Sequence, residues 1–269
     1  MLLTLGLREA LRPPLFEGAS LVLGLIVGSF ANVCIHRIPI GHSVVSPPSR
    51  CPSCGALIRP WDNIPVLSYL VLRGRCRSCG APISPRYPAV EMVNGLAYLG
   101  LAWLAGPSLQ TFVSMALVTA LLVLSLIDLD HHLLPNVITL PGIAAGLVAS
   151  FLPGSRVTPL AAAEAALGGY LALFAVARAY RWFRGVEGLG QGDWKMVAML
   201  GAFFGWPKLL LTVFLACLAG TAVGLAFIAF RGRDLRYALP LGTFLGGAAI
   251  VVIFAGDPLL AWYQGFLHG

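Results

Sequence analysis

Long apolar stretches recur along this chain, and they constrain its fold more than any other feature. Eight can be drawn, at about 19–36, 89–105, 109–127, 133–152, 160–180, 192–206, 208–230 and 237–255. Each approaches the roughly 20 residues that a helix needs to cross a bilayer, and the sixth is the shortest. Only 11% of the residues are charged, whereas a soluble domain carries about 25%. We therefore predict an all-α polytopic membrane protein with about eight transmembrane helices.

The basic residues are concentrated in particular breaks between these stretches. Seven arginines lie between positions 37 and 88, where Asp62 is the only acid. The breaks at 181–191 and 231–236 are also basic, whereas the breaks between them hold only Arg156 and Lys208. Under the positive-inside rule, this alternation predicts that the three basic breaks face the cytoplasm. The net charge of +7 therefore requires no nucleic-acid partner.

Four cysteines in the first polar break form two Cys-x2-Cys pairs, each followed by glycine. The pairs are Cys51 with Cys54 and Cys76 with Cys79. Two such turns can present four thiolates to one tetrahedral Zn²⁺, which leaves no open position for catalysis. The alternative is two disulfides or redox chemistry, which a reducing cytoplasm disfavours. We predict a structural zinc site in a zinc-ribbon-like loop between the first and second transmembrane helices.

Two aspartates lie at the ends of apolar stretches. Asp128 in LSLIDLDHHLLPN ends the third stretch, and Asp193 in GLGQGDWK begins the sixth. Charges at membrane depth are costly and are functional candidates, and the topology puts both near the same cytoplasmic boundary. Two adjacent carboxylates can share a proton, so that one activates a water while the other protonates a carbonyl. This is the chemistry of an aspartic protease placed in a membrane.

The same acids are also compatible with roles outside catalysis. Asp128 and its neighbour Asp130 could cap the fourth stretch, and Asp193 could cap the sixth while Lys195 reaches the interface. The adjacent His131 and His132 are more typical of a solvated boundary than of a catalytic metal site. A transporter with an acidic cation site, or a zinc-bearing scaffold of a secretion machine, would also account for part of the pattern.

Together, these motifs resemble the type IV prepilin peptidases, bifunctional membrane aspartic proteases of the GxGD class. The resemblance covers nearly the whole chain and rests on GLIVGSFANVCIHRIP (24–39), the double Cys-x2-Cys loop, SPRYPAVEMVNGL (84–96), IDLDHHLLPN (127–136), GLGQGDWKMVAMLGAFFGW (188–206) and YALPLGTFLGG (237–247). It implies that Asp128 and Asp193 are the catalytic pair. The supporting residues that it implies are Gly190, Gly192, Lys195 and Asp130. Asn136 stands where the family often has aspartate.

The resemblance also implies two activities. These are cleavage of the basic leader of prepilins or pseudopilins on the cytoplasmic side, and N-methylation of the new amino terminus by S-adenosylmethionine. The cysteine loop resembles the methyltransferase-associated zinc loop of the longer bacterial members. Candidate contacts to the methyl donor are Asn32, Glu91 and Asn94. A peptidase without methyl transfer is the alternative.

The expected setting is the bacterial inner (cytoplasmic) membrane, with the zinc loop and the active site facing the cytoplasm. The expected partners are the prepilin or pseudopilin substrates and the lipid bilayer, with no nucleic acid, and the sequence defines no oligomeric state. We expect three parts: an N-terminal segment with the first transmembrane helix (1–36), a cytoplasmic zinc-binding loop (37–88) and a seven-helix membrane peptidase core (89–269).

Overall fold

The computed structural model describes residues 14–186, 190–231 and 240–268, and its long elements are all helices. Four regions with sequence-based expectations lie partly outside the described residues. They are the N-terminal segment (residues 1–13 of it), the basic break at 181–191 with the start of the motif at 188–206 (residues 187–189), the basic break at 231–236 (residues 232–236) and the last apolar stretch (residues 237–239). The chain forms two compact units, residues 1–119 and residues 120–269. Each is described by itself.

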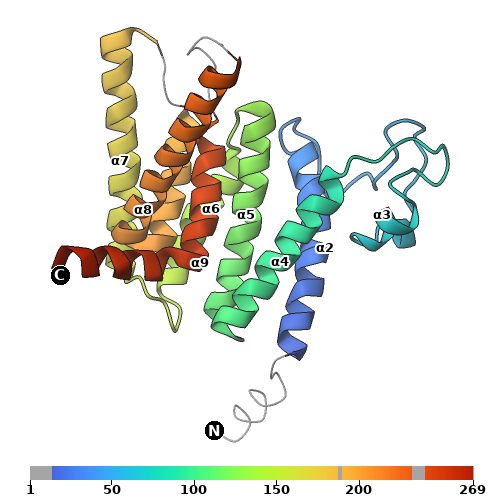
Figure 1. Ribbon diagram of the computed structural model, residues 1–269, viewed down its shortest axis with the longest axis horizontal. Coiled ribbons are helices and arrows are strands. Elements are labelled where there is room, and N and C mark those ends of the chain that lie inside the picture. The colour runs from blue at the N-terminus through green and yellow to red at the C-terminus, as the bar shows by residue number, and fades with distance from the viewer. Residues whose placement is uncertain (1–13, 187–189, 232–239, 269) are drawn as a thin grey trace, which may run out of the picture. The chain divides into compact units, whose positions relative to one another are not determined.

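The first unit is built on a pair of packed helices, α2 (Leu15–Arg37) and α4 (Arg86–Ala105). Figure 1 shows them side by side, with the loop that carries η1 (Pro60–Asp62) and α3 (Leu67–Val71) between them in sequence. Glycines permit a close approach: a Cβ on Gly24 would lie 2.8 Å from Gly95 Cα. The Gly24-x3-Gly28 spacing places two small residues on one face of α2, as in many membrane helix pairs.

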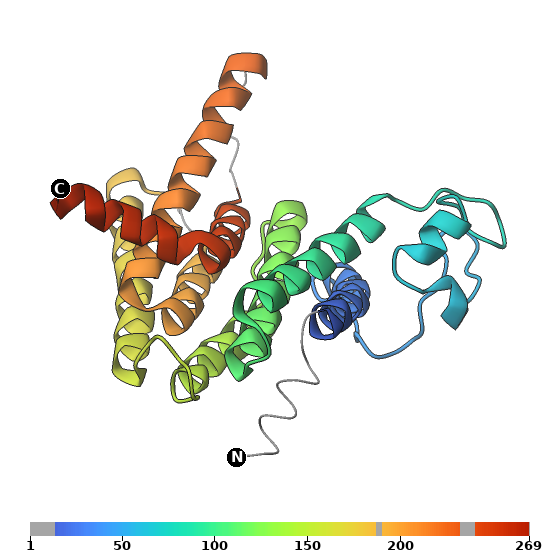
Figure 2. The same cartoon turned by 60° about the horizontal axis from the view of Figure 1, so that its bottom comes forward.

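The second unit begins within α5 (Leu109–His131), which starts in the first unit. It continues with α6 (Asn136–Ser150), α7 (Pro159–Arg184), α8 (Gln191–Arg231) and α9 (Leu241–His268). Helix α8 packs against α6, α7 and α9, and Figures 1 and 2 both show its first half beside α7. A Cβ on Gly146 would lie 2.7 Å from Ala202 Cβ, and one on Gly201 would lie 2.5 Å from Ala165 O. Small residues therefore fix the position of α8 among its neighbours.

Helix α8 is interrupted near its middle. Gly205 has φ 65° and ψ −178°, a conformation outside the helical range, and Pro207 follows. Proline removes a backbone donor, and glycine adopts the positive φ without strain, so the two residues together break the helix. The break coincides with the expected boundary between the sixth and seventh apolar stretches.

The helices confirm the predicted class of multi-pass helical membrane protein. Among the described residues, five helices are long and apolar enough to cross a membrane: α2, α5, α7, α8 and α9. Helix α6 is shorter, at 15 residues. Helices or half-helices overlap the described part of every expected apolar stretch. The number of crossings and the three-part division into 1–36, 37–88 and 89–269 stay predictions.

Candidate active site and metal centre

Each Cys-x2-Cys pair folds as a tight turn closed by its own backbone. Cys51 N–H donates to Ala56 O at 2.9 Å, and Gly55 N–H donates to Cys51 O at 2.9 Å. The second pair repeats both hydrogen bonds, at 2.8 and 2.9 Å. The glycine after each pair has a φ of 71°, which an L side chain rarely adopts. The two turns are therefore near copies of one local structure.

The two turns bring four sulfur atoms together, those of Cys51, Cys54, Cys76 and Cys79. All lie within 4.8 Å of one another, and the sulfurs of Cys51 and Cys79 are 3.9 Å apart. A tetrahedral site with zinc–sulfur bonds of about 2.3 Å places its sulfurs about 3.8 Å apart, so the cluster fits a four-thiolate metal centre. All four cysteines are free, which excludes disulfides among them in this structure.

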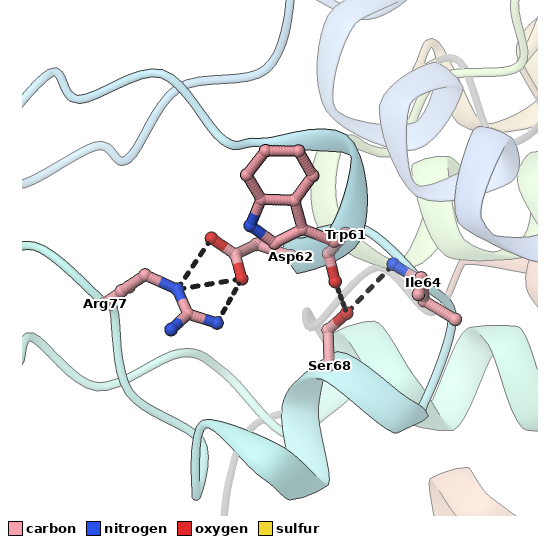
Figure 3. Close-up of polar contacts among 5 residues, drawn as sticks. All are labelled: Trp61, Asp62, Ile64, Ser68 and Arg77. Atoms are coloured by element: carbon pink, nitrogen blue, oxygen red, sulfur yellow. Dashed lines mark hydrogen bonds and ion pairs between the residues drawn. The ribbon is translucent and has the colours of Figure 1, made fainter.

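An ion pair ties the segment between the turns to the second turn. Arg77 Nε donates to both oxygens of Asp62 at 3.0 Å, and its Nη2 donates to Oδ1 at 2.6 Å (Figure 3). Asp62 ends η1, and Arg77 directly follows Cys76. The hydrogen bonds and charge of Arg77 hold the pKa of the Asp62 carboxyl below its usual range. This contact was not predicted from the sequence, although Asp62 is the single acid among the arginines of the loop.

Asp128 lies in the last turn of α5 and is 5% exposed. Its Oδ2 accepts hydrogen bonds from Thr243 N–H at 2.8 Å and from Thr243 Oγ1 at 3.2 Å. Thr243 belongs to the first turn of α9, where backbone N–H groups have no partner within their own helix. These donors, with the partial positive charge of the helix end, offset part of the cost of burying a carboxylate.

Asp193 lies in the first turn of α8 and is 9% exposed. Its Oδ2 accepts a hydrogen bond from Gly190 N–H at 3.0 Å. This contact is half of a capping box, in which an acid at the third helical position binds the residue before the helix. The capping role is therefore present, and it places the second buried carboxylate, like the first, at a helix N-terminus.

Leu134 lies against glycines that are close to both carboxylates. A Cβ on Gly192, next to Asp193, would lie 2.6 Å from Leu134 Cβ. A Cβ on Gly242 would lie 2.8 Å from Leu134 Cδ1 and 2.9 Å from Asp128 Oδ2. One leucine side chain thus contacts the backbone beside both acids. The glycines are needed at these positions because any side chain would displace Leu134 or the carboxylate.

Two other predicted motif residues are Lys195 and Asp130. Lys195 Nζ donates to Asn136 Oδ1 at 2.8 Å, which links α8 to the first residue of α6. Lys195 therefore has a partner on α6, which the sequence did not predict. Asp130 is exposed near the end of α5, unlike the buried Asp128. Their roles in catalysis stay predictions.

The three candidate contacts to a methyl donor are engaged in packing within the first unit. Asn32 Nδ2 donates to Tyr87 O at 3.0 Å, and Glu91 Oε2 accepts from Val66 N–H at 2.8 Å. Asn94 donates to a backbone carbonyl of α2 at 2.8 Å and is completely buried. The structure brings all three to the α2–α4 pair, and contact with a methyl donor stays a prediction.

Three residues close to the carboxylates were not predicted from the sequence: Leu134, Gly242 and Thr243. Gly242 and Thr243 belong to the YALPLGTFLGG motif but had no expected role, and Leu134 carried no expectation. A signal was available for the first two, because they follow Pro240 at the start of an apolar stretch, which is typical of a helix N-terminus.

Comparison with known proteins gives matches over both units. Residues 22–105 match the Bacterial Peptidase A24 N-terminal domain, and residues 115–225 match the Type IV leader peptidase family. The chain is 39% identical to the Prepilin leader peptidase/N-methyltransferase of Pseudomonas putida, over 96% of this chain and 97% of the relative. Its identity to the protein of that name from Burkholderia pseudomallei (strain 1026b) is 40%, over 89% and 85%. No solved structure matches.

The fold and these matches define a multi-pass membrane peptidase. The chain belongs to the type IV leader peptidase family, since the alignment with its relatives extends over nearly the full length of both.

Proposed function

We propose that the chain removes the leader peptide of type IV prepilins or pseudopilins and then N-methylates the new amino terminus. The observation that carries the peptidase half is the pair of buried carboxylates, Asp128 and Asp193, each with a glycine close by that packs against Leu134. Buried acids of this kind are costly and are retained for chemistry. The family of the chain supplies the substrate class, because its members are leader peptidases.

Asp128 and Asp193 supply the acid and the base of peptide hydrolysis. One carboxylate takes a proton from a water as the water oxygen bonds to the scissile carbonyl carbon. The other, protonated, donates to the carbonyl oxygen, and the carbon–nitrogen bond then breaks as the nitrogen gains a proton. The leader leaves as a new carboxylate, and the pilin keeps a free amine. No covalent enzyme intermediate is needed.

The surrounding backbone orients the two acids. Thr243 holds one oxygen of Asp128, and Gly190 holds one oxygen of Asp193. The absence of a side chain at Gly242 lets the α9 backbone approach Asp128 closely, and Gly192 leaves room for Leu134 next to Asp193. An extended substrate backbone has the same need for close approach, which the glycines beside Asp193 serve.

The cysteine loop supports the second activity. The four thiols suit a structural Zn²⁺ that cross-links the two turns and leaves no coordination position for substrate. S-adenosylmethionine supplies the methyl group, which passes from its sulfonium sulfur to the free amine. The names of the relatives, which include N-methyltransferase, support this half for a chain that keeps all four cysteines.

The arginine-rich loop supports a cytoplasmic location for the metal centre. Positive-inside topology in a bacterial inner membrane puts residues 37–88 on the cytoplasmic side. Successive spans cross the membrane in opposite directions. The end of the third span, with Asp128, and the start of the sixth, with Asp193, therefore also lie on the cytoplasmic side. A substrate whose basic leader stays in the cytoplasm would meet the site there.

Mass spectrometry of a prepilin incubated with the purified enzyme tests both halves. We expect a cut that releases the leader, and a further gain of one methyl group only when S-adenosylmethionine is present. Replacing either acid, as Asp128→Asn or Asp193→Asn, should slow cleavage by at least about 10²–10⁴-fold, because one proton-transfer group is lost. Zinc content should stay unchanged and serves as the folding control.

Normal cleavage by either variant would rule out the carboxylate pair as the catalytic group. If the wild type cleaved the prepilin but added no methyl group, the chain would be a peptidase without methyltransferase activity. A transporter or a scaffold would cut no prepilin.

A further inference from the structure

A strained turn lies in the loop between the two Cys-x2-Cys turns. Val66 has φ 62° and ψ −48°, and Leu67 N–H donates to Pro65 O at 2.6 Å. This is a γ-turn with positive φ, the rare and strained form. A β-branched residue is a genuine outlier in this region. Such strain persists only where the surroundings enforce it, and it clusters at functional sites.

Glu91 binds the backbone of this turn. Its Oε2 accepts the Val66 N–H at 2.8 Å, and the side chain is buried at 8% exposed. A Cβ on Gly28 would lie 2.8 Å from Glu91 Cα, so α2 presses directly against this turn of α4. A buried carboxylate on a helix packed this closely makes a strong, well-directed acceptor.

The strained turn leads directly into α3, whose Ser68 binds the backbone on the other side of the turn. Helix α3 starts at the next residue, and its Ser68 Oγ accepts from Ile64 N–H at 2.9 Å. The same hydroxyl donates to Trp61 O at 3.0 Å (Figure 3). Trp61 adjoins Asp62, which binds Arg77 beside the second cysteine turn. An unbroken series of contacts therefore runs from a buried helix residue to the metal centre.

We propose that Glu91 is a positioning residue for methyl transfer. It holds the Val66 turn, and through that turn the cysteine loop, in one orientation against the α2–α4 pair. This inference rests on the proposed role of the loop in methylation. It differs from direct contact with the methyl donor, because Glu91 acts through a backbone amide of the loop.

The first test replaces the acceptor, as Glu91→Ala, in the full-length enzyme. Loss of a charged hydrogen bond should lower the methylation rate about 10- to 100-fold. Leader cleavage should stay close to wild type, and zinc content should be unchanged. Met92→Ala is the matched control, since it removes the adjacent, 38% exposed side chain from the same helix. Unchanged methylation, or equal loss of methylation, cleavage and zinc, would overturn the proposal.

The second test separates positioning from direct contact. Glycine adopts a φ near 62° without strain, so Val66→Gly makes the turn easier to hold without Glu91. The double variant Glu91→Ala/Val66→Gly should recover most of the methylation that Glu91→Ala loses. A double variant as slow as Glu91→Ala would show that Glu91 acts on the donor or acceptor directly, and would refute positioning.

Hydrogen exchange of amides 61–72 gives a readout that does not depend on methylation. Exchange should rise in Glu91→Ala and fall again in the double variant. This pattern would show that the hydrogen bond from Val66 N–H to Glu91 orders the loop, even if the wild type had peptidase activity and no methyltransferase activity. Unaltered exchange in Glu91→Ala would refute it whatever the activity.

Discussion

The cysteine loop and the carboxylate site are built over very different distances along the chain. In the loop, each turn is closed by bonds such as that from Cys51 N–H to Ala56 O. At the carboxylate site, Asp128 accepts from Thr243, which is 115 residues further along. The loop is thus assembled from two copies of a local turn, whereas the carboxylate site exists only when α5, α8 and α9 are packed.

This difference teaches which changes each site should tolerate. The metal centre should depend on its four ligands and on the short bonds around them. The carboxylate site should depend on small residues far from either acid in sequence, such as Gly242. The two sites also belong to different compact units, so their failures should be separable in one set of assays.

The largest separation should come from Cys51→Ser combined with Cys54→Ser. Structural zinc contributes on the order of 10 kcal/mol to the folding of a small metal-bound module, so methylation should fall by at least about 100-fold. Leader cleavage should fall much less. Zinc analysis and mass spectrometry of the product measure the two effects. Equal loss of both activities would indicate general misfolding and would break the comparison.

A large effect at the other site should come from Gly242→Ala. The added methyl group would lie 2.9 Å from Asp128 Oδ2 and 2.8 Å from Leu134 Cδ1. Overpacking of about 1–3 kcal/mol should slow cleavage about 10- to 100-fold. Methylation of an already cleaved peptide should not change.

Gly247→Ala is the control for this variant. Gly247 lies on the same helix as Gly242, and a Cβ on it would meet nothing within 4 Å. It should cleave at the wild-type rate. If both alanine variants were equally slow, the contact with Asp128 would not be the cause.

Thr243→Val should have a moderate effect on cleavage. It removes the hydroxyl that donates to Asp128 at 3.2 Å and keeps the backbone donor at 2.8 Å. Loss of one hydrogen bond of about 0.5–1.5 kcal/mol corresponds to a decrease in rate of about 2- to 12-fold. Thr243→Ser keeps the hydroxyl and should restore the rate. A slow serine variant would point to packing by the threonine methyl group instead.

Asp62→Asn should have the smallest effect, because Arg77 is half exposed and ion pairs open to solvent contribute little. Arg77 lowers the pKa of Asp62 in the folded loop. The pair therefore stabilises the loop above the unfolded pKa of about 3.9, and this support disappears as pH falls through the lowered folded value. Hydrogen exchange of the loop at pH 7 should rise slightly in the variant, with zinc retained. Loss of zinc at pH 7 would contradict this ranking.

The sequence predicted much of the fold and of the metal centre for identifiable reasons. Apolar stretches long enough for a bilayer mark the helices, and the Gly205–Pro207 break was visible as a boundary between two of them. The paired cysteines lie in turns whose geometry is set by the glycine that follows each pair. These are local properties, and local sequence is enough to express them.

The sequence alone determined the helical membrane class and the pairing of four cysteines in two turns. It also singled out Asp128 and Asp193 as acids at the ends of apolar stretches. Only the tertiary structure decided that Thr243 hydrogen-bonds to Asp128 and that Glu91 accepts the backbone N–H of Val66. It also decided that Leu134 packs against Gly192, next to Asp193, and lies close to Gly242, beside Asp128. Those contacts join residues on separate elements, and their geometry follows from how closely glycine-bearing helices can pack. A linear pattern specifies which residues can form a turn, whereas long-range packing specifies which distant residues meet.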